Sequence, residues 1–130
     1  MIESSADASA LLDNHDTFVF DCDGVLWVGN DPVPGAVECV QGLMHRGKSV
    51  FFVTNAAGKH RSKLIDKFHR LGFSDVRFDQ IYSSAFATAM YLKRQTSDGS
   101  GGSTCHTVMS IGADGIVEEL QVTEYLHHKR

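Results

Sequence analysis

Two short β-prone runs that end abruptly in polar residues constrain the fold of this chain more than any other feature. The run Thr17–Phe20 leads directly into Asp21–Gly24, and the run Ser49–Val53 leads into Thr54–Asn55. Short apolar runs bounded by turn residues are typical of strands that are buried on both faces of a parallel sheet. The sequence therefore predicts two such strands, each with a polar cluster at its carboxyl end.

Helical spacing of apolar residues follows the predicted strands. Strands are expected at 17–20, 49–53, 80–82 and 107–112, with helices between Pro34 and Gly47 and over 59–71, 84–94 and 116–126. This alternation predicts the α/β fold class, a Rossmann-like parallel sheet with helices on its faces and right-handed crossovers. Because ligands bind beyond the carboxyl ends of the strands in such sheets, both polar clusters lie where a functional site is expected.

The chain divides into four expected parts. Residues 1–15 are polar and uneven, which predicts a mobile leader, and residues 96–104 form a Gly/Ser-rich stretch typical of a flexible linker. Residues 16–95 hold the strands and helices of the core. Residues 105–130 hold one further strand–helix unit, separated from the core by the linker.

The composition excludes several classes of function. The chain has 130 residues with 12 basic and 16 acidic side chains, a formal net charge of −4, and therefore no basic stripe for nucleic acid. No apolar run approaches the ~20 residues that span a bilayer, and the acidic N-terminus has no apolar centre typical of a secretory signal. The cysteines Cys22, Cys39 and Cys105 show no paired spacing. We therefore expect reduced thiols and a cytoplasmic protein.

Asp21 and Asp23 are candidate catalytic residues because the predicted strand breaks between them, which lets them take different roles. One carboxylate can act as a nucleophile and the other as a general acid or base. Close carboxylates repel each other, so an ionised Asp21 calls for a nearby cation, and Mg²⁺ prefers oxygen ligands. The alternative is a turn or helix-capping cluster that does no chemistry.

Gly24, Thr54 and Asn55 are candidate phosphate-binding residues. Gly24 lets the backbone approach a phosphate closely, with its N–H directed inward. The Thr54 hydroxyl and the Asn55 amide can orient a phosphoryl oxygen or the nucleophile itself. Thr54 and Asn55 are also compatible with a simple helix N-cap after a strand. Cys22 alternates away from both aspartates and is expected in the core.

These motifs together resemble the haloacid dehalogenase (HAD) superfamily of phosphatases. Phe20–Trp27 (FDCDGVLW) is similar to the family's first signature, DxDG(V/T)(L/I), and Val33–Ala36 and Phe52–Asn55 continue the similarity. Further similar positions are Lys59, Arg61, Arg70–Phe73, Ile81–Ser84 and Ile111–Ile116. The pattern resembles the branch that contains 4-nitrophenylphosphatase, phosphoglycolate phosphatase, pyridoxal phosphate phosphatase and NagD-like enzymes.

The resemblance implies a Mg²⁺-dependent phosphomonoesterase that acts on small phosphate esters. It implies that Asp21 attacks phosphorus to form an aspartyl-phosphate, and that Asp23 protonates the leaving oxygen and later activates water. It also implies that Thr54 binds the phosphoryl group, that Asn55 positions Asp21, and that the Asp21 carboxylate and the Asp23 backbone carbonyl hold the metal. Residues 16–95 would then be the N-terminal part of a HAD core, and 105–130 the start of a C2-type α/β cap.

The sequence departs from the family pattern at two points. Ala56 and Ala57 stand where the family has Asn and Ser, and the family's later Lys and GDxxxxD signature do not occur before Arg130. These departures support a second hypothesis, a non-catalytic or truncated fragment that folds with a partner or as an exchanged homodimer, because half a parallel sheet leaves an unpaired edge. A phospho-acceptor signalling domain is a third hypothesis, disfavoured because no Asp ends the second or third predicted strand.

Overall fold

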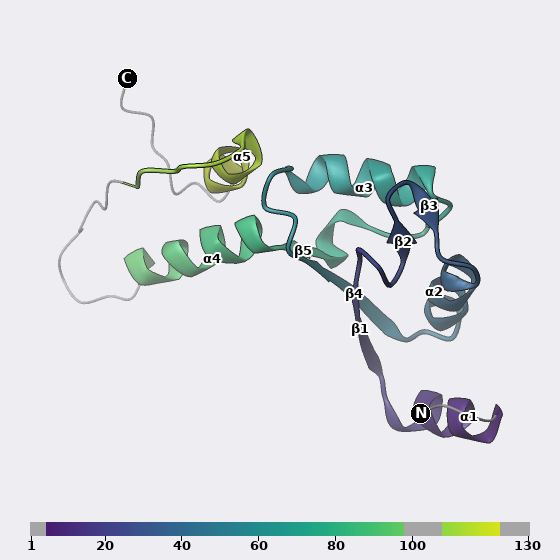
Figure 1. Cartoon of the computed structure of the whole chain (residues 1–130). Coiled ribbons are helices and arrows are strands. Elements are labelled where there is room, and N and C mark those ends of the chain that lie inside the picture. The colour runs from purple at the N-terminus through teal and green to yellow at the C-terminus, as the bar shows by residue number, and fades with distance from the viewer. Residues whose placement is uncertain (1–4, 98–107, 123–130) are drawn as a thin grey trace.

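The computed structural model describes residues 5–97 and 108–122, with side chains described for 9–94 and 108–122. The elements follow an alternation of strands and helices (Figure 1). In chain order they are α1 (Ser5–Asn14), β1 (Thr17–Asp21), β2 (Trp27–Val28), β3 (Asp31–Pro32), α2 (Ala36–His45), β4 (Ser49–Thr54), α3 (Arg61–Arg70), the 3₁₀ helix η1 (Phe78–Gln80), β5 (Ile81–Ser83), α4 (Ser84–Ser97) and α5 (Asp114–Val122). No helix within these described ranges is long and apolar enough to cross a membrane.

The main sheet is parallel, which confirms the predicted α/β fold class. Its strand order is β1-β4-β5, and the register pairs Phe20 with Phe52 and Phe52 with Ile81. Strands β2 and β3 form a small antiparallel hairpin directly after the Asp21–Gly24 turn. The strands predicted at 17–20, 49–53 and 80–82 are confirmed within one residue at either end.

The predicted helix ends at Gly47 and Gly72 are also confirmed by the backbone. Gly47 has φ +72° and Gly72 has φ +97°, a left-handed conformation that side-chain-bearing residues rarely adopt. Their N–H groups donate to the carbonyls of Met44 and His69 in the last turns of α2 and α3. Each glycine therefore ends its helix and turns the chain back towards the sheet.

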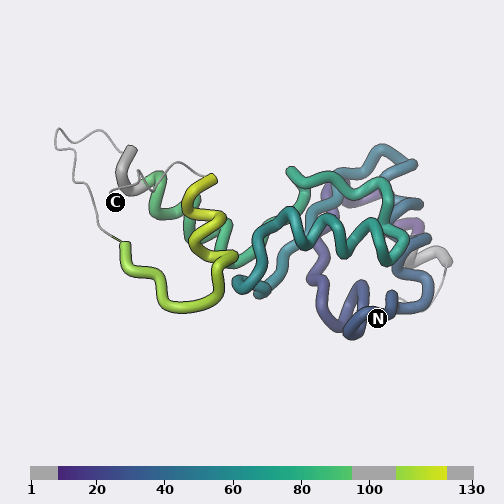
Figure 2. The backbone as a smooth tube through the Cα atoms, turned by 90° about the horizontal axis from the view of Figure 1, so that it is seen from above, coloured from purple at the N-terminus to yellow at the C-terminus, as the bar shows by residue number. Residues whose placement is uncertain are grey.

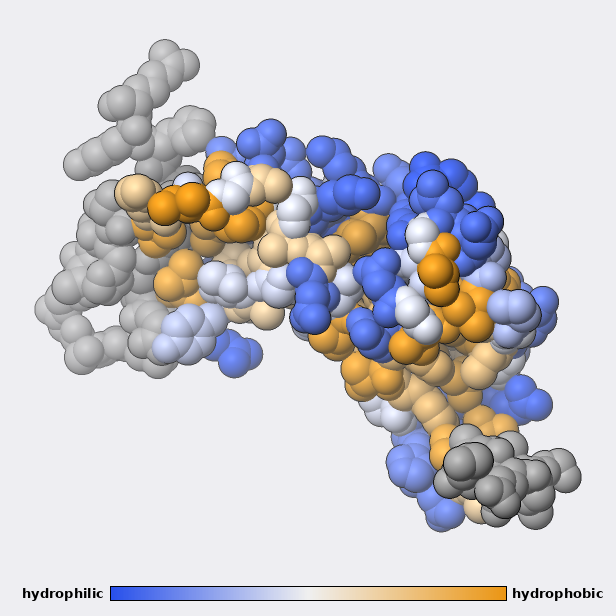
Figure 3. Space-filling view, in the orientation of Figure 1, coloured by the Kyte–Doolittle hydropathy of each residue, from blue (hydrophilic) through white to orange (hydrophobic). Residues whose placement is uncertain are grey.

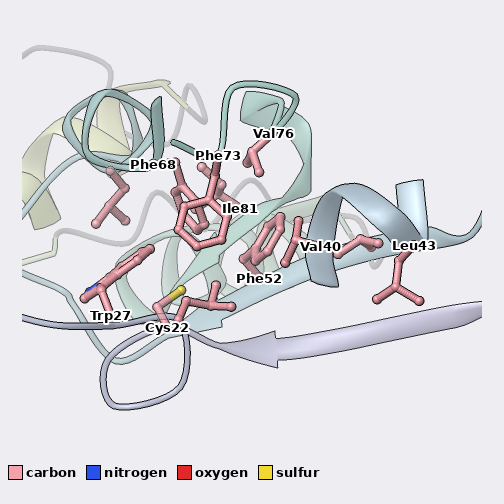
Figure 4. Close-up of a cluster of buried hydrophobic side chains, with 12 residues drawn as sticks. Cys22, Trp27, Val40, Leu43, Phe52, Phe68, Phe73, Val76 and Ile81 are labelled. Atoms are coloured by element: carbon pink, nitrogen blue, oxygen red, sulfur yellow. The ribbon is translucent and has the colours of Figure 1, made fainter. Parts of the chain in front are cut away.

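The core lies on one face of the sheet, under α2 and α3 (Figure 4). Val40 and Leu43 of α2 and Phe68 of α3 pack against Phe52 and Ile81 of the strands. The rings of Phe52 and Phe68 lie 4.7 Å apart between centroids. Apolar periodicity in the sequence and burial in the structure therefore agree on this face.

The opposite face of the sheet is open, which corrects the expectation of strands buried on both faces. Val19 is 63% exposed, Val53 47% and Tyr82 41%, and the register places all three on this face. In Figure 3, apolar atoms reach the surface in the middle of the molecule, where Figure 1 draws the strands. The described residues supply helices for only one of the two faces.

The two ends of the described chain add details that the sequence did not predict. Helix α1 forms over residues 5–14, within the segment predicted as a mobile leader. The strand predicted at 107–112 is wrong for residues 108–112, which form no strand, and Thr107 lies outside the described residues. Of the predicted linker 96–104, Thr96 and Ser97 lie in the last turn of α4, and residues 98–104 lie outside the described residues. Without that strand, the described part of the expected cap consists of α5 and the segment that precedes it.

Helix α5, which lies in the segment predicted as the first unit of a cap, packs against α4. Figure 2 shows α5 beside α4, and contacts between the two helices agree with that view. At its N-terminus, Gly115 lies so close to the segment between β4 and α3 that a Cβ there would meet the Lys59 backbone nitrogen at 2.6 Å. The approach of α5 to the segment after β4 thus depends on a glycine at this position.

Candidate functional site

The carboxyl ends of β1 and β4 bring two of the predicted site residues to one edge of the sheet. Asp21 pairs in register with Val53, and Thr54 follows Val53 at the end of β4. Asp21 is exposed, and its Oδ1 accepts a hydrogen bond of 2.8 Å from the Cys22 backbone N–H. The Asp21 carboxylate is therefore both oriented and open to solvent.

A tight turn over Cys22–Trp27 follows Asp21 directly and carries Asp23. The Cys22 carbonyl accepts from the Leu26 N–H at 2.9 Å, and Gly24 adopts φ +85°. The Gly24 N–H donates to the Trp27 carbonyl at 2.8 Å. The Gly24 N–H was expected to face a phosphate, but this bond already uses it. Phosphate binding by Gly24 therefore stays a prediction, and it requires the turn to rearrange.

Asp23 is held by side chains that the sequence analysis did not connect to it. Its Oδ1 accepts from Trp27 Nε1 at 2.8 Å and lies 3.8 Å from the Lys67 Nζ of α3. The Lys67 ammonium also lies over the Trp27 ring, 4.4 Å from its centroid. Trp27 packs in the core and is 1% exposed. No local pattern in the sequence indicated the role of Lys67.

Thr54 and Asn55 differ in how far they reach towards solvent. Thr54 is 3% exposed, and its Oγ1 accepts from the Ala56 N–H at 3.2 Å. Asn55 is exposed, and its backbone carbonyl accepts from the Ser84 hydroxyl at 3.2 Å. The two residues thus form a stabilised turn after β4, with the Asn55 side chain available to a ligand.

Cys22 lies between the two aspartates in sequence but points into the core, as predicted. Its side chain is fully buried, and burial is the main cause that raises the pKa of its thiol to about 12. The negative charges of Asp21 and Asp23 raise that pKa further. A thiol with so high a pKa is not a nucleophile near neutral pH.

The oxygen atoms at this edge of the sheet are suited to bind a hard cation through a small number of protein ligands. The Asp21 carboxylate and the Asp23 backbone carbonyl offer oxygen atoms, the ligand type of Mg²⁺, which also keeps several waters. The Asp23 carboxylate oxygen Oδ1 is engaged by Trp27 and Lys67, so the carbonyl of Asp23 is the better donor. Within residues 5–97 and 108–122 there is no group of three or more His, Cys, Asp or Glu residues that could hold a metal.

A second charged cluster, missed by the sequence analysis, is buried where α5 meets α3. The Arg61 Nε donates to Glu119 at 3.1 Å and 3.2 Å, and the Arg61 backbone N–H donates to Glu119 Oε1 at 2.9 Å. The Arg61 guanidinium lies over the rings of Phe86 and Phe78, 3.3 Å and 4.5 Å from their centroids. Only the fold brings together residues so distant in sequence.

Comparison with known proteins shows which family the chain belongs to. The sequence model of the haloacid dehalogenase-like hydrolases matches residues 18–125. Phosphoglycolate phosphatase 2 of Arabidopsis thaliana is 39% identical over 122 residues, which cover 94% of this chain and 39% of that protein. The chain thus spans well under half the length of this relative.

Solved structures agree in fold. The 4-nitrophenylphosphatase of Thermotoga maritima superposes with a TM-score of 0.75 at 20% identity, covering 91% of this chain and 42% of that one. A glycerol phosphate phosphatase of Mycobacterium tuberculosis in complex with magnesium gives a TM-score of 0.70 at 24% identity, covering 86% of this chain and 31% of that one. Since the family model accounts for most of its length, the chain belongs to the haloacid dehalogenase-like hydrolases, in the branch with the NagD-like enzymes and 4-nitrophenylphosphatases.

Proposed function

We propose that this chain carries the nucleophile and phosphate-binding residues of a Mg²⁺-dependent phosphomonoesterase that works through an aspartyl-phosphate. The observation that supports this most is the position of Asp21, exposed at the end of β1 and in register with the end of β4. Asp23 stands on the next turn and Thr54 on the neighbouring strand end. A nucleophile, a second carboxylate and hydroxyl and amide groups for phosphate thus share one edge.

The first chemical step belongs to Asp21. A carboxylate oxygen of Asp21 attacks phosphorus, a new O–P bond forms, and the bond from phosphorus to the ester oxygen breaks. The Asp23 carboxyl donates its proton to the leaving oxygen, so the alcohol departs neutral. The Cys22 N–H already holds one Asp21 oxygen at 2.8 Å, which fixes the direction of the carboxylate.

The second step releases phosphate and restores both aspartates. Asp23, now ionised, removes a proton from a water molecule, and the resulting hydroxide attacks the phosphorus of the aspartyl-phosphate. The bond between phosphorus and the Asp21 oxygen breaks, and inorganic phosphate leaves. Asp23 ends protonated and Asp21 ionised, as they began.

Binding of the phosphoryl group falls to the turn after β4. The Asn55 side chain is exposed beside this edge, and the buried Thr54 hydroxyl can donate its proton while its oxygen accepts from Ala56. Gly24 would add a backbone donor if its turn opens. Bound Mg²⁺ would neutralise negative charge on the phosphoryl oxygens and on Asp21. The metal would be held by the Asp21 carboxylate and the Asp23 carbonyl.

Small phosphate esters are the proposed substrates. The relatives are phosphatases named for phosphoglycolate and glycerol phosphate among others, and one similar structure is a magnesium complex. We infer no nucleic-acid or membrane partner, because the chain is acidic with a net charge of −4. A cytoplasmic location is proposed from the free thiols of Cys22 and Cys39.

The test is hydrolysis of 4-nitrophenyl phosphate by the full chain with Mg²⁺, compared with Asp21→Asn. We expect Mg²⁺-dependent release of nitrophenolate that EDTA abolishes and that Asp21→Asn lowers by about 10³-fold or more. Asp13→Asn is the matched control, an exposed aspartate of α1 that precedes the amino end of β1, and should retain the full rate. No hydrolysis by the unchanged chain, or equal rates with Asp21→Asn, would contradict the proposal.

The open face of the sheet favours a second candidate, a fragment that acts only with a partner or as a homodimer. Val19, Val53 and Tyr82 expose apolar surface there, and both β1 and β5 are edge strands of the described sheet. Sedimentation separates the candidates: a monomer that unfolds cooperatively would argue against the second, and a stable dimer would support it.

A further inference from the structure

Lys67 reaches the candidate site from α3 and contacts two residues of the Asp21–Trp27 segment. Its ammonium lies 3.8 Å from Asp23 Oδ1 and 4.4 Å from the centre of the Trp27 ring. The Lys67 side chain is only 17% exposed, whereas that of Asp23 is 65% exposed. Because so little of this long cationic side chain is exposed, we expect it to do more than keep the surface soluble.

Trp27, which Lys67 contacts, is itself held firmly in the core. The indole is 1% exposed and meets Phe68 and Phe73 edge-on, with ring centroids 4.8 Å and 6.2 Å apart. Phe68 is the next residue after Lys67 on α3 and is fully buried. The ring and the helix therefore hold Lys67 Nζ and Trp27 Nε1 in fixed positions, and both point at the same oxygen of Asp23.

Other cations near Lys67 do not share this geometry. Lys67 lines a cleft of about 260 Å³ between the β2–β3 turn and α3, together with Asn30, Lys59, Lys63, Leu64, Asp66 and Arg70. Lys63 stands one turn before Lys67 on the same helix and is exposed. Lys63 therefore provides a control of equal charge on the same helix.

We propose that Lys67 is a positioning residue that acts through Asp23: with the Trp27 indole it fixes the orientation of the Asp23 carboxylate relative to Asp21. Without Lys67, the carboxylate keeps one side-chain hydrogen bond, from Trp27, and gains freedom to rotate about its side-chain torsions. This inference rests on the proposed function, in which Asp23 transfers the proton. It adds a residue from α3 to a site otherwise built from strand ends.

The kinetic test is a double-mutant cycle on the full chain, with 4-nitrophenyl phosphate and Mg²⁺. We expect Lys67→Met to lower kcat about tenfold with KM within about twofold, because orientation and not binding is lost. Lys67→Arg should recover most of kcat, and Lys63→Met should leave it unchanged. In an Asp23→Ala background, Lys67→Met should cause no further loss. A Lys67→Met loss of equal size in both backgrounds, or a loss that falls on KM alone, would overturn the proposal.

A second readout does not depend on activity. Trp27 is the only tryptophan of the chain, so its indole N–H gives a single NMR resonance that reports its bond to Asp23. Lys67→Met should shift this resonance towards its position in Asp23→Ala, and should shift it far less when Asp23 is already alanine. An unmoved resonance in Lys67→Met would overturn the proposal. If the unchanged chain is inactive, the proposed function fails, and this resonance still decides the role of Lys67.

Discussion

The two carboxylate sites of this chain differ in almost every physical respect. Asp21 and Asp23 stand exposed at the sheet edge, whereas Glu119 is fully buried. Glu119 accepts hydrogen bonds from the side chain and the backbone of Arg61, while Asp21 accepts one from the backbone N–H of Cys22. The comparison separates a carboxylate that holds the fold together from carboxylates that remain open to a ligand.

This difference explains why the strand ends are the candidate site and the buried pair is not. A buried carboxylate needs its partner, and its oxygens are already used by Arg61. Exposed carboxylates are stabilised by water and can exchange that water for a cation or a phosphoryl group. Substitutions at the buried pair should therefore change stability most, and substitutions at the strand ends should change chemistry with little effect on stability.

The largest expected effect is that of breaking the buried pair. Arg61→Met should lower the free energy of unfolding by about 3–5 kcal/mol, because it removes the guanidinium that pairs with the buried Glu119 carboxylate. Chemical denaturation measures the change. The double variant Arg61→Met/Glu119→Leu should be clearly more stable than Arg61→Met alone; a loss below about 1 kcal/mol in the single variant would contradict a structural role for the pair.

A smaller effect is expected where α5 approaches the loop after β4. Gly115→Ala should destabilise by about 1–3 kcal/mol, since the new Cβ would lie 2.6 Å from the Lys59 backbone and 2.7 Å from that of Gly58. Gly58→Ala is the matched control, because its Cβ would meet Ala113 at an ordinary 3.5 Å. Equal stability of Gly115→Ala and the unchanged chain would show that α5 does not pack here.

The thiol beneath the exposed aspartates should make stability depend on alkaline pH. Burial raises the pKa of the Cys22 thiol to about 12, from an ordinary value of 9.0. Below pH 9 the thiol is protonated in both states and contributes nothing; from pH 9 to 12 the unfolded thiol ionises first. This favours unfolding by about 1 kcal/mol per pH unit. The measurement compares the free energies of unfolding of the chain and of Cys22→Ala from pH 9 to 12. A difference between them that does not change with pH would contradict this prediction.

The smallest effect on stability is expected at the proposed nucleophile. Asp21→Asn should change the free energy of unfolding by less than about 0.5 kcal/mol, because the side chain is exposed and asparagine can still accept from the Cys22 N–H. Denaturation curves of the two proteins should nearly coincide. A loss comparable to that of Arg61→Met would mean that Asp21 is a structural residue, and the distinction between the two sites would fail.

Local signals account for the parts of the fold that the sequence predicted. The strands β1, β4 and β5 were marked by short apolar runs, and the ends of α2 and α3 by Gly47 and Gly72, whose backbone conformations favour glycine. The strand at 107–112 had the same kind of apolar pattern but is wrong for 108–112, where Met109 and Ile111 are exposed. An apolar run alone does not supply the neighbouring strand that a sheet requires.

The candidate site was predictable only where a local pattern marks the end of a strand. Asp21, Asp23, Thr54 and Asn55 could be placed at strand ends from pattern alone. Lys67 could not, because its contact with Asp23 depends on how α3 packs over Trp27. Arg61 and Glu119 were missed for the same reason: their pairing depends on the packing of α5, which no local spacing predicts.

Trapping of the aspartyl-phosphate tests the central claim most directly. In Asp23→Asn the water-activating group is lost, while 4-nitrophenolate leaves without needing a proton, so the phosphoryl group should remain on the protein. Acid quenching after incubation with 4-nitrophenyl phosphate and Mg²⁺, followed by peptide mass spectrometry, should find one phosphoryl group on Asp21. The adduct should be absent from Asp21→Asn/Asp23→Asn. No adduct on Asp23→Asn, or an adduct on another residue, would contradict the assignment of Asp21 as the nucleophile.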